Sequence, residues 1–256
     1  MIFTNKRVLI TGSSRGIGLA TAQRFLAEGA HVVINGRSSE TVNAALDTLG
    51  GGEMVSGVVA DMAKVIDCET LVKKAVDTLG GLDILVTAAG VAHALPIEET
   101  SEEIWDSTLD INLKGLFFTC RAALPFLRES GGCIVNIASD SGVRGEAFLA
   151  AYCASKAAVM NMTKAMALEL APQVRVNSVC PGYVDTDMVR RDFIDQAGDP
   201  AQFEAELLRG TPLRRFAKPS EIAGAVCYLS GPDSGFITGS CLSIDGGTSA
   251  GSYVEF

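Results

Sequence analysis

Tyr152 and Lys156 stand four residues apart in the segment AAYCASKAAV, residues 150–159. On a helix this spacing puts both side chains on one face, one turn apart. A phenol can donate or accept a proton, and an adjacent ammonium group favours the phenolate and lowers the pKa of the phenol. The pair is therefore either an ordinary polar pair on a core helix or a proton-transfer device.

Two more polar residues stand where a site could form. Ser139 follows the apolar run CIVNIA, residues 133–138, at the expected carboxyl end of a strand. Open α/β sheets build their sites at that edge. For Ser139 alone, a serine in a turn is the commoner reading, and Ser141 is a neighbouring rival. Asn112, in DINLKG, is disfavoured in a helix interior, which favours a special role.

A glycine-rich turn follows the first apolar run. The segment TGSSRGIG carries Gly12, Gly16 and Gly18 ahead of a helical pattern. Glycines let the backbone turn sharply and approach a pyrophosphate, and the free amides of a helix N-terminus donate hydrogen bonds to it. Because a strand pattern precedes the turn and a helix pattern follows it, we expect a nucleotide site rather than only a tight turn.

The end of the second apolar run bears on the choice of cofactor. An acidic side chain there would accept hydrogen bonds from the adenosine ribose hydroxyls of NAD. This chain has Asn35, Gly36 and Arg37 instead, with Arg15 in the glycine loop. Two guanidinium groups suit a 2′-phosphate, so we expect NADP in preference to NAD. The alternative is that Arg37 is a solvated surface residue.

The elements that must position these residues are short β-branched runs that alternate with helical patterns. Several runs are apolar throughout, as parallel strands covered on both faces are. The alternation predicts a single α/β domain over residues 1–256, with a doubly wound, parallel, seven-stranded, Rossmann-like sheet and helices on both faces. The expected strands are residues 7–11, 31–35, 54–59, 83–88, 133–138, 174–180 and 241–245.

One long insertion, residues 185–218, separates the sixth strand from a helix that begins near Pro219. We expect it to be irregular and to act as a substrate lid, because such a stretch in a compact domain is usually functional. Its charged residues either form a solvated face or meet a polar substrate. They are Arg190, Arg191, Asp192, Arg214 and Arg215.

Composition and charge argue against several classes of protein. Of the 256 residues, 48% are apolar and 20% are charged, as in globular proteins. A net charge of −9 without a basic patch argues against nucleic-acid binding. The chain shows no signal-peptide layout and no uninterrupted run of about 18 apolar residues, so we expect a cytoplasmic protein without a membrane span. Seven cysteines without a CxxC pair, and two histidines, predict free thiols and no metal site.

Five motifs in this order resemble the short-chain dehydrogenase/reductase family, in its compact single-domain branch. They are Gly12-x3-Gly16-x-Gly18, Asn112 in DINLKG, Ser139, Tyr152-x3-Lys156 and PGYVDT at residues 181–186. The resemblance runs from residue 7 to about residue 247. It implies that Tyr152 is the general acid and base, that Ser139 holds the substrate oxygen, that Lys156 also bonds the nicotinamide ribose, and that Asn112 anchors a proton-relaying water.

The resemblance also implies a set of cofactor contacts. Asp61 and Met62 would meet the adenine ring, and Val184 and Thr186 the nicotinamide amide. Thr87 stands where the family usually has Asn, so the bracing of the fourth strand departs from the family pattern. The cofactor-binding residues that we expect are Gly12, Ser14, Arg15, Gly16, Ile17, Gly18, Arg37, Asp61, Met62, Ala89, Gly90, Tyr152, Lys156, Pro181, Gly182, Val184 and Thr186.

The expected activity is NADP-dependent interconversion of a ketone and a secondary alcohol by hydride transfer. The alternatives are an NAD-dependent alcohol or polyol dehydrogenase and a catalytically silent nucleotide-binding scaffold; a nucleotide-sugar epimerase generally carries a larger substrate domain. The resemblance extends to gluconate 5-dehydrogenases and 3-oxoacyl carrier-protein reductases without deciding between them. We expect Arg144, Glu146, His93, Leu95 and Tyr183 around the substrate.

The family resemblance further implies a homotetramer with two-fold interfaces. The expected contact surfaces are the helices at about residues 102–130 and 148–170, together with the C-terminal strand.

Overall fold

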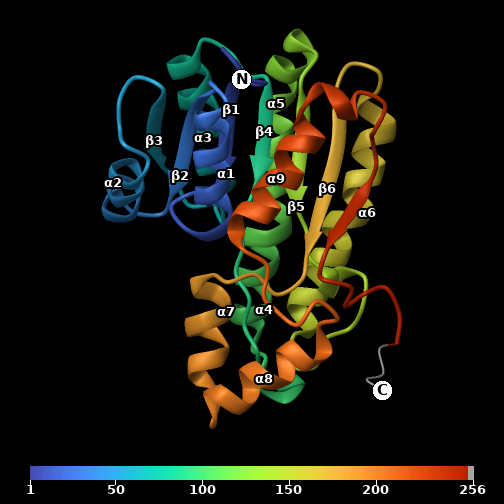
Figure 1. Cartoon of the computed structure of the whole chain (residues 1–256). Coiled ribbons are helices and arrows are strands. Elements are labelled where there is room, and N and C mark those ends of the chain that lie inside the picture. The colour runs from blue at the N-terminus through green and yellow to red at the C-terminus, as the bar shows by residue number, and fades with distance from the viewer. Residues whose placement is uncertain (253–256) are drawn as a thin grey trace.

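Seven parallel strands form one sheet in the order β3-β2-β1-β4-β5-β6-β7 (Figure 1). This computed structural model describes residues 1–252. Each strand coincides with one of the apolar runs, and the central strands are buried on both faces, as the continuous hydrophobicity predicts. The strands are β1 (Arg7–Thr11), β2 (His31–Gly36), β3 (Val55–Val59), β4 (Ile84–Thr87), β5 (Cys133–Ile137), β6 (Arg175–Pro181) and β7 (Cys241–Ile244).

Helices cover both faces of this sheet, which confirms the predicted architecture (Figure 1). One face packs against α1 (Gly16–Ala27), α2 (Ser39–Thr48) and α9 (Pro219–Ser230). The other packs against α3 (Val65–Leu79), α5 (Leu116–Ser130) and α6 (Ala150–Leu170). Short helical turns are Ile97–Glu99, Asp140–Gly142 and Pro232–Ser234. No helix within residues 1–252 is both long enough and apolar enough to span a membrane.

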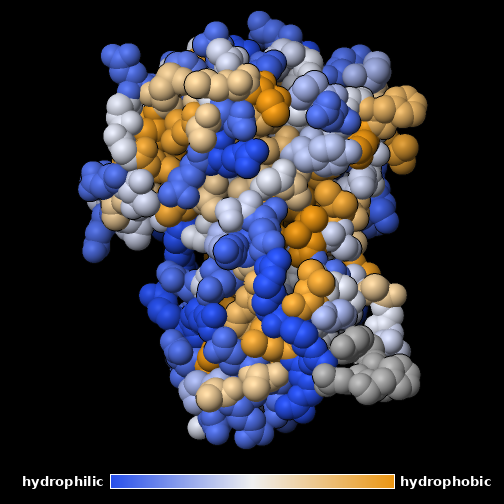
Figure 2. Space-filling view, viewed as in Figure 1, coloured by the Kyte–Doolittle hydropathy of each residue, from blue (hydrophilic) through white to orange (hydrophobic). Residues whose placement is uncertain are grey.

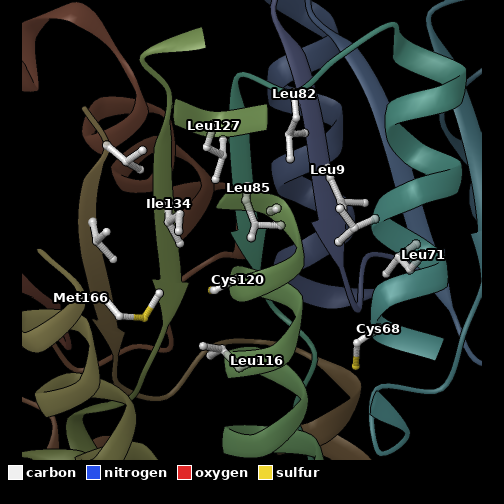
Figure 3. Packing of buried hydrophobic residues seen from close by; sticks show 14 of the residues in the cluster. Leu9, Cys68, Leu71, Leu82, Leu85, Leu116, Cys120, Leu127, Ile134 and Met166 are labelled. Carbon is white, nitrogen blue, oxygen red and sulfur yellow. The ribbon is translucent and has the colours of Figure 1, made fainter. Parts of the chain in front are cut away.

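The core divides into two clusters because side chains alternate along each strand. Leu9 points to the face of α3 and α5, whereas Val8 and Ile10 point to the face of α1 and α9. Figure 3 shows the first cluster, in which strand residues such as Leu85 and Ile134 meet the side chains of the helices. The two clusters hold the sheet rigidly between two layers of helices.

The sheet order changes direction between β1 and β4, which are neighbours although they are not consecutive in the chain. Leu9 pairs with Leu85, and Thr11 with Thr87. Ligands of open α/β sheets bind in the crevice outside the carboxyl ends of the strands at such a point. The topology therefore places a crevice beside the glycine loop that follows β1.

Thr87, where the resemblance leads us to expect Asn, braces β4 through a buried hydrogen bond. Its hydroxyl donates to Asn136 Oδ1 at 2.8 Å, and Asn136 Nδ2 donates to Thr163 Oγ1 at 2.9 Å. All three side chains are buried. The chain of bonds ties β4 to β5 and to α6, just below the residues that form the crevice.

Residues 185–218 are not irregular, so that part of the prediction is wrong. They contain α7 (Asp187–Asp192), a short turn at Ile194–Gln196 and α8 (Pro200–Gly210). Asp199 caps α8 by accepting a hydrogen bond from the Gln202 amide at 3.0 Å, and Pro200 occupies the first turn, where its missing N–H costs nothing. Figure 1 shows α7 and α8 beyond the carboxyl ends of the strands.

Candidate active site

A cavity of about 360 Å³ lies at the carboxyl ends of the central strands, between the start of α6 and the helices α7 and α8. Ser139, Tyr152 and Lys156 all line it, although they come from the end of β5 and from α6. Asn112 is buried beside it. The structure thus gathers the four residues of the predicted catalytic set around one cavity.

Tyr152 is partly buried, and its environment favours the protonated phenol. Burial raises the pKa of Tyr152 to about 12; the hydrogen bond with Ser139 works in the opposite direction, and the negative charge of Asp140 adds to the increase. A phenol with this pKa keeps its proton at neutral pH. The surroundings of Tyr152 therefore stabilise the neutral phenol relative to the phenolate.

Lys156 is buried against the same wall of the cavity. Its Nζ donates to the Ile137 carbonyl at 2.9 Å and lies 5.6 Å from the centre of the Tyr152 ring. Burial lowers the pKa of Lys156 to about 8. The pKa of Tyr152 is nevertheless raised, because burial of the phenol outweighs the hydrogen bond with Ser139, and the lowering of this pKa by Lys156 stays a prediction.

Ser139 lies between the β5 strand and the turn that follows it. Its Oγ accepts from the Ser141 amide at 3.2 Å and donates to Asp140 Oδ1 at 3.3 Å. The rival Ser141 is also buried and also lines the cavity. Ser139, unlike Ser141, is among the groups that shift the pKa of the Tyr152 phenol, which separates the two serines by their surroundings.

Asn112 lies in a π-helical segment, Asp110–Gly115, that joins α4 (Glu102–Leu109) to α5. Such segments are rare and occur often at functional sites. Asn112 Oδ1 accepts from the Val91 amide at 2.8 Å, and Nδ2 donates to the Val91 carbonyl and to Ser155 Oγ. Asn112 therefore ties the loop after β4 to α6, one turn from Tyr152.

The glycine loop makes a cradle that no side chain fills. Gly12 has a φ of +59°, and a Cβ there would lie 2.4 Å from Ala89 Cα; a Cβ on Gly18 would lie 2.5 Å from the Gly12 carbonyl oxygen. No side chain caps the N-terminus of α1, so its first amides are available to an anion. The loop fits the pyrophosphate of a dinucleotide.

Two buried polar side chains hold this loop, and the sequence analysis did not assign them that role. Asn35 Oδ1 accepts from the Gly12 amide at 3.1 Å, while its Nδ2 donates to the Val58 and Ala60 carbonyls. Ser13 Oγ donates to the Ile10 carbonyl and accepts from the Asn35 amide. The Asn35 side chain thus points inward.

The two arginines of the cofactor prediction are both exposed. Arg37 follows β2 directly, and Gly36 before it carries no side chain. Arg15 stands at the N-cap of α1, with its guanidinium 3.4 Å from Asp187 of α7. The end of β2 therefore presents a cation and no carboxylate.

The remaining predicted cofactor residues differ in their surroundings. Ala89 packs against Gly12, and Gly90 lies beside Asn112 and Lys156. Asp61 accepts from the Ala63 amide, whereas the Met62 side chain is buried in the core and leaves only its backbone for an adenine ring. Besides Tyr152 and Lys156, the residues of this set that line the cavity are Ile17, Gly90, Pro181, Gly182, Val184 and Thr186.

The predicted substrate residues divide into two groups. Glu146 and Tyr183 line the cavity, but Arg144 does not. Among the described residues that line the cavity, Ala92 and Ala94 take the places expected for His93 and Leu95. Thr248 Oγ1 donates to Asp140 Oδ2 at 2.8 Å. No sequence pattern pointed to Asp140 or Thr248, because only the fold brings the C-terminal segment to this loop.

No charged residue of 185–218 is among the described residues that line the cavity. Arg190 pairs with Asp185 and Glu204 and stacks on Phe216, and Arg215 pairs with Glu221. Hydrophilic side chains cover much of the outer surface of the region of α7 and α8 in the view of Figure 2. The cavity wall from these helices is apolar. It consists of Met188, Val189, Phe193, Phe203 and Leu207.

Comparison with known proteins agrees with this geometry. A family model described as enoyl-(acyl carrier protein) reductase matches residues 12–249. The D-beta-hydroxybutyrate dehydrogenase of Rhizobium meliloti is 38% identical over 257 residues, which cover 96% of this chain and 99% of that protein. The meso-2,3-butanediol dehydrogenase of Serratia marcescens is 38% identical over 251 residues, which cover 98% of this chain and 97% of that protein.

A solved structure from Brucella melitensis, described as a short-chain dehydrogenase/reductase of the glucose/ribitol dehydrogenase type, superposes with a TM-score of 0.90. It is 38% identical, and the match covers 96% of this chain and 98% of that chain. Both the sequence and the fold therefore match over nearly the whole length. The chain belongs to the short-chain dehydrogenase/reductase family and is an NAD(P)-dependent oxidoreductase that acts on CH–OH groups.

Proposed function

We propose that this protein interconverts a ketone and a secondary alcohol with NADP, and that Tyr152 is the general acid and base. The observation that carries the proposal is the convergence of Ser139, Tyr152 and Lys156 on one cavity beside the glycine loop. A bound nicotinamide cofactor would supply or accept the hydride. The chain's own residues then have to hold the substrate oxygen and move one proton.

Tyr152 donates its proton to the oxygen of the ketone as negative charge develops there. Its pKa, about 12 in this pocket, keeps the phenol protonated until negative charge develops on the substrate oxygen. Ser139 orients the same oxygen through its hydroxyl. In the opposite direction Tyr152 must lose its proton first, so alcohol oxidation requires a further cation in the site or a higher pH.

Lys156 and Asn112 support this proton transfer. Lys156 keeps a largely protonated ammonium group at neutral pH, since its pKa is about 8, and it would hold the nicotinamide ribose. Asn112 fixes the backbone of Val91 and, through Ser155, the first turns of α6. We assign Asn112 the anchoring of a water that relays protons from Lys156.

The preference for NADP rests on the end of β2. Asn35 is committed to the glycine loop and Gly36 has no side chain, so neither supplies the acceptor that NAD requires at the ribose hydroxyls. Arg37 is exposed beside this position. The steady-state kcat/KM for NADPH should therefore exceed that for NADH. Equal values would contradict the preference for NADP and leave NAD as the alternative cofactor.

The matched variants are Arg37→Gln and Arg128→Gln. Arg128 is an exposed residue in the last turn of α5, at the opposite edge of the sheet. Arg37→Gln should lower the ratio of NADPH to NADH kcat/KM by about tenfold or more, because one charge-assisted contact to the 2′-phosphate is lost. Arg128→Gln should leave that ratio unchanged. An unchanged ratio in Arg37→Gln would contradict the assignment of Arg37.

Residues 185–218 act as the substrate lid in this proposal. The apolar residues of α7 and α8 already form one wall of the cavity, and Arg15 joins the glycine loop to Asp187 at the start of α7. Deleting α8 would open the cavity to water, so the ketone KM should rise far more than the NADPH KM. Equal changes in both constants would argue against a lid.

We further propose that the protein is a homotetramer. Trp105 of α4 and Phe117 of α5 are large apolar side chains that are about 41% exposed, and Leu168 of α6 is more exposed still. These helices are the surfaces expected for two-fold contacts. Light scattering should give four times the 26.8 kDa mass of the chain. A monomeric mass would contradict this assembly.

A further inference from the structure

The charged residues beside the cavity form a closed network with one cation at its centre. Arg144 Nη2 lies 3.0 Å from Asp140 Oδ2 and 2.8 Å from Glu146 Oε2. Glu146 Oε1 also accepts a hydrogen bond from the Tyr183 hydroxyl at 2.5 Å. The network therefore contains two carboxylates, one guanidinium and one phenol hydroxyl. The positive charge of Arg144 is fully balanced by the two carboxylates.

The order of these groups decides what a ligand meets. Asp140 and Glu146 line the cavity, whereas Arg144, which is paired with both, does not. Among the described residues that line the cavity, Lys156 is the only basic one, and its Nζ is already bonded to the Ile137 carbonyl. A carboxylate substrate would thus face two acidic side chains and would lack a guanidinium to bind it.

The opposite wall of the cavity is built from hydrocarbon side chains. Phe193, Phe203 and Leu207 come from the segment of α7 and α8, and Phe148 joins them from the loop before α6. Phe148 is 63% exposed and has a φ of +66°. A bulky aromatic side chain in the left-handed region is a costly conformation that clusters at binding sites. Apolar side chains that line a cavity favour the binding of an apolar ligand.

We propose that the substrate is an uncharged ketone, or the matching secondary alcohol, whose larger substituent is a hydrocarbon chain or ring, and that Glu146 excludes substrates with a carboxylate. This inference rests on the proposed function, since it concerns the same cavity. Glu146 acts by neutralising Arg144 and by presenting its own negative charge. The hydrocarbon substituent lies against the wall of Phe193, Phe203 and Leu207.

The test uses two ketones that differ at one end only. In 5-methyl-2-hexanone an isopropyl group stands where 4-oxopentanoate has a carboxylate of similar shape. The parent protein should reduce the neutral ketone with a kcat/KM at least about a hundredfold higher than that for the anion. Equal values, or a preference for 4-oxopentanoate, would overturn the inference.

Glu146→Gln keeps the shape of the side chain and removes its negative charge, so that Arg144 is balanced by Asp140 alone and the network no longer carries a net negative charge. This variant should raise kcat/KM for 4-oxopentanoate by about tenfold or more, without a matching rise for the neutral ketone. Glu204→Gln is the control, because Glu204 pairs with Arg190 and does not line the cavity. The same change in both variants, or none in Glu146→Gln, would contradict the role of Glu146.

A second variant and a binding measurement keep the inference testable if Glu146→Gln fails to fold. Phe203→Asn, on the partly exposed face of α8, should raise the KM for 5-methyl-2-hexanone and leave the KM for 4-oxopentanoate unchanged. Calorimetric titration of both ketones into NADPH-loaded protein separates the two claims. Selective binding of the neutral ketone without turnover would overturn the proposed function alone, whereas selective binding of the anion, or binding of neither, would overturn this inference.

Discussion

Thr87→Val removes one hydroxyl from the middle of the fold and almost nothing else. The Thr87 hydroxyl donates to Asn136 Oδ1, which in turn is held by the bond from Asn136 Nδ2 to Thr163. Both Thr87 and Asn136 are buried, so water cannot replace the lost donor. Valine has nearly the same shape as threonine, and the change therefore isolates the hydrogen bond.

The expected cost follows from the acceptor that is left behind. A buried acceptor without its donor costs about 1–3 kcal/mol. The Cys120 thiol, 3.9 Å from Asn136 Oδ1, is a weak donor that offsets part of this cost. We therefore expect a loss of about 2 kcal/mol in the free energy of unfolding. For a domain of this size, that corresponds to a decrease of about 4–8 °C in Tm.

Differential scanning calorimetry at neutral pH measures this decrease directly. Thr70→Val is the control, because Thr70 is exposed on α3 and its hydroxyl donates only to the Ile66 carbonyl within the same helix. Thr87→Ser, which keeps the hydroxyl, should recover most of the lost stability. If Thr87→Val melted within about 1 °C of Thr70→Val, the buried chain of bonds would not brace β4 as described.

Three further outcomes follow from the structure. Gly12→Ala should lower NADPH affinity at least tenfold in a fluorescence titration, because its Cβ would lie 2.4 Å from Ala89 Cα at a φ of +59°. Asp83→Asn should cost about 1–3 kcal/mol of stability at pH 7: burial works to raise the Asp83 pKa, but the hydrogen bonds from Arg7 outweigh it and lower the pKa. That contribution is present above the unfolded pKa and is lost as the pH falls through the folded pKa, so the stabilities of the parent and the variant in urea melts should begin to converge as the pH falls below about 4. The kcat/KM for alcohol oxidation should rise from about pH 6 to about pH 9 while that for ketone reduction does not, since the Tyr152 pKa is raised and only oxidation needs the phenolate.

The strands and the main helices could be predicted because their hydrophobic pattern reports burial on both sides. Runs such as RVLIT and CIVNI are apolar at every position that the sheet covers. The helices of residues 185–218 were missed because their charged residues read as a loop, although Asp199 followed by Pro200 is an N-terminal helix signal. The amphipathic pair Phe203 and Leu207, four residues apart, was a second signal for α8.

The catalytic residues could be placed at the carboxyl edge because parallel strands end on the same side. Their electrostatics could not, because the pKa of Tyr152 depends on how deeply the fold buries it and on Asp140, which the sequence did not single out. The ion pair of Arg144 and Glu146 could not be predicted from the sequence for the same reason. Sequence spacing places charges near a pocket, but only the fold decides which of them face the ligand.

The most direct test of the central claim is the activity of Tyr152→Phe with NADPH and a ketone that the parent protein reduces. Tyr228→Phe, at an exposed position on α9, is the matched control, and a fluorescence titration checks that both variants still bind NADPH. Loss of the proton donor should lower kcat about 100-fold to 10,000-fold in Tyr152→Phe alone. A kcat within about threefold of the parent value, with NADPH binding intact, would contradict the assignment of Tyr152 as the general acid.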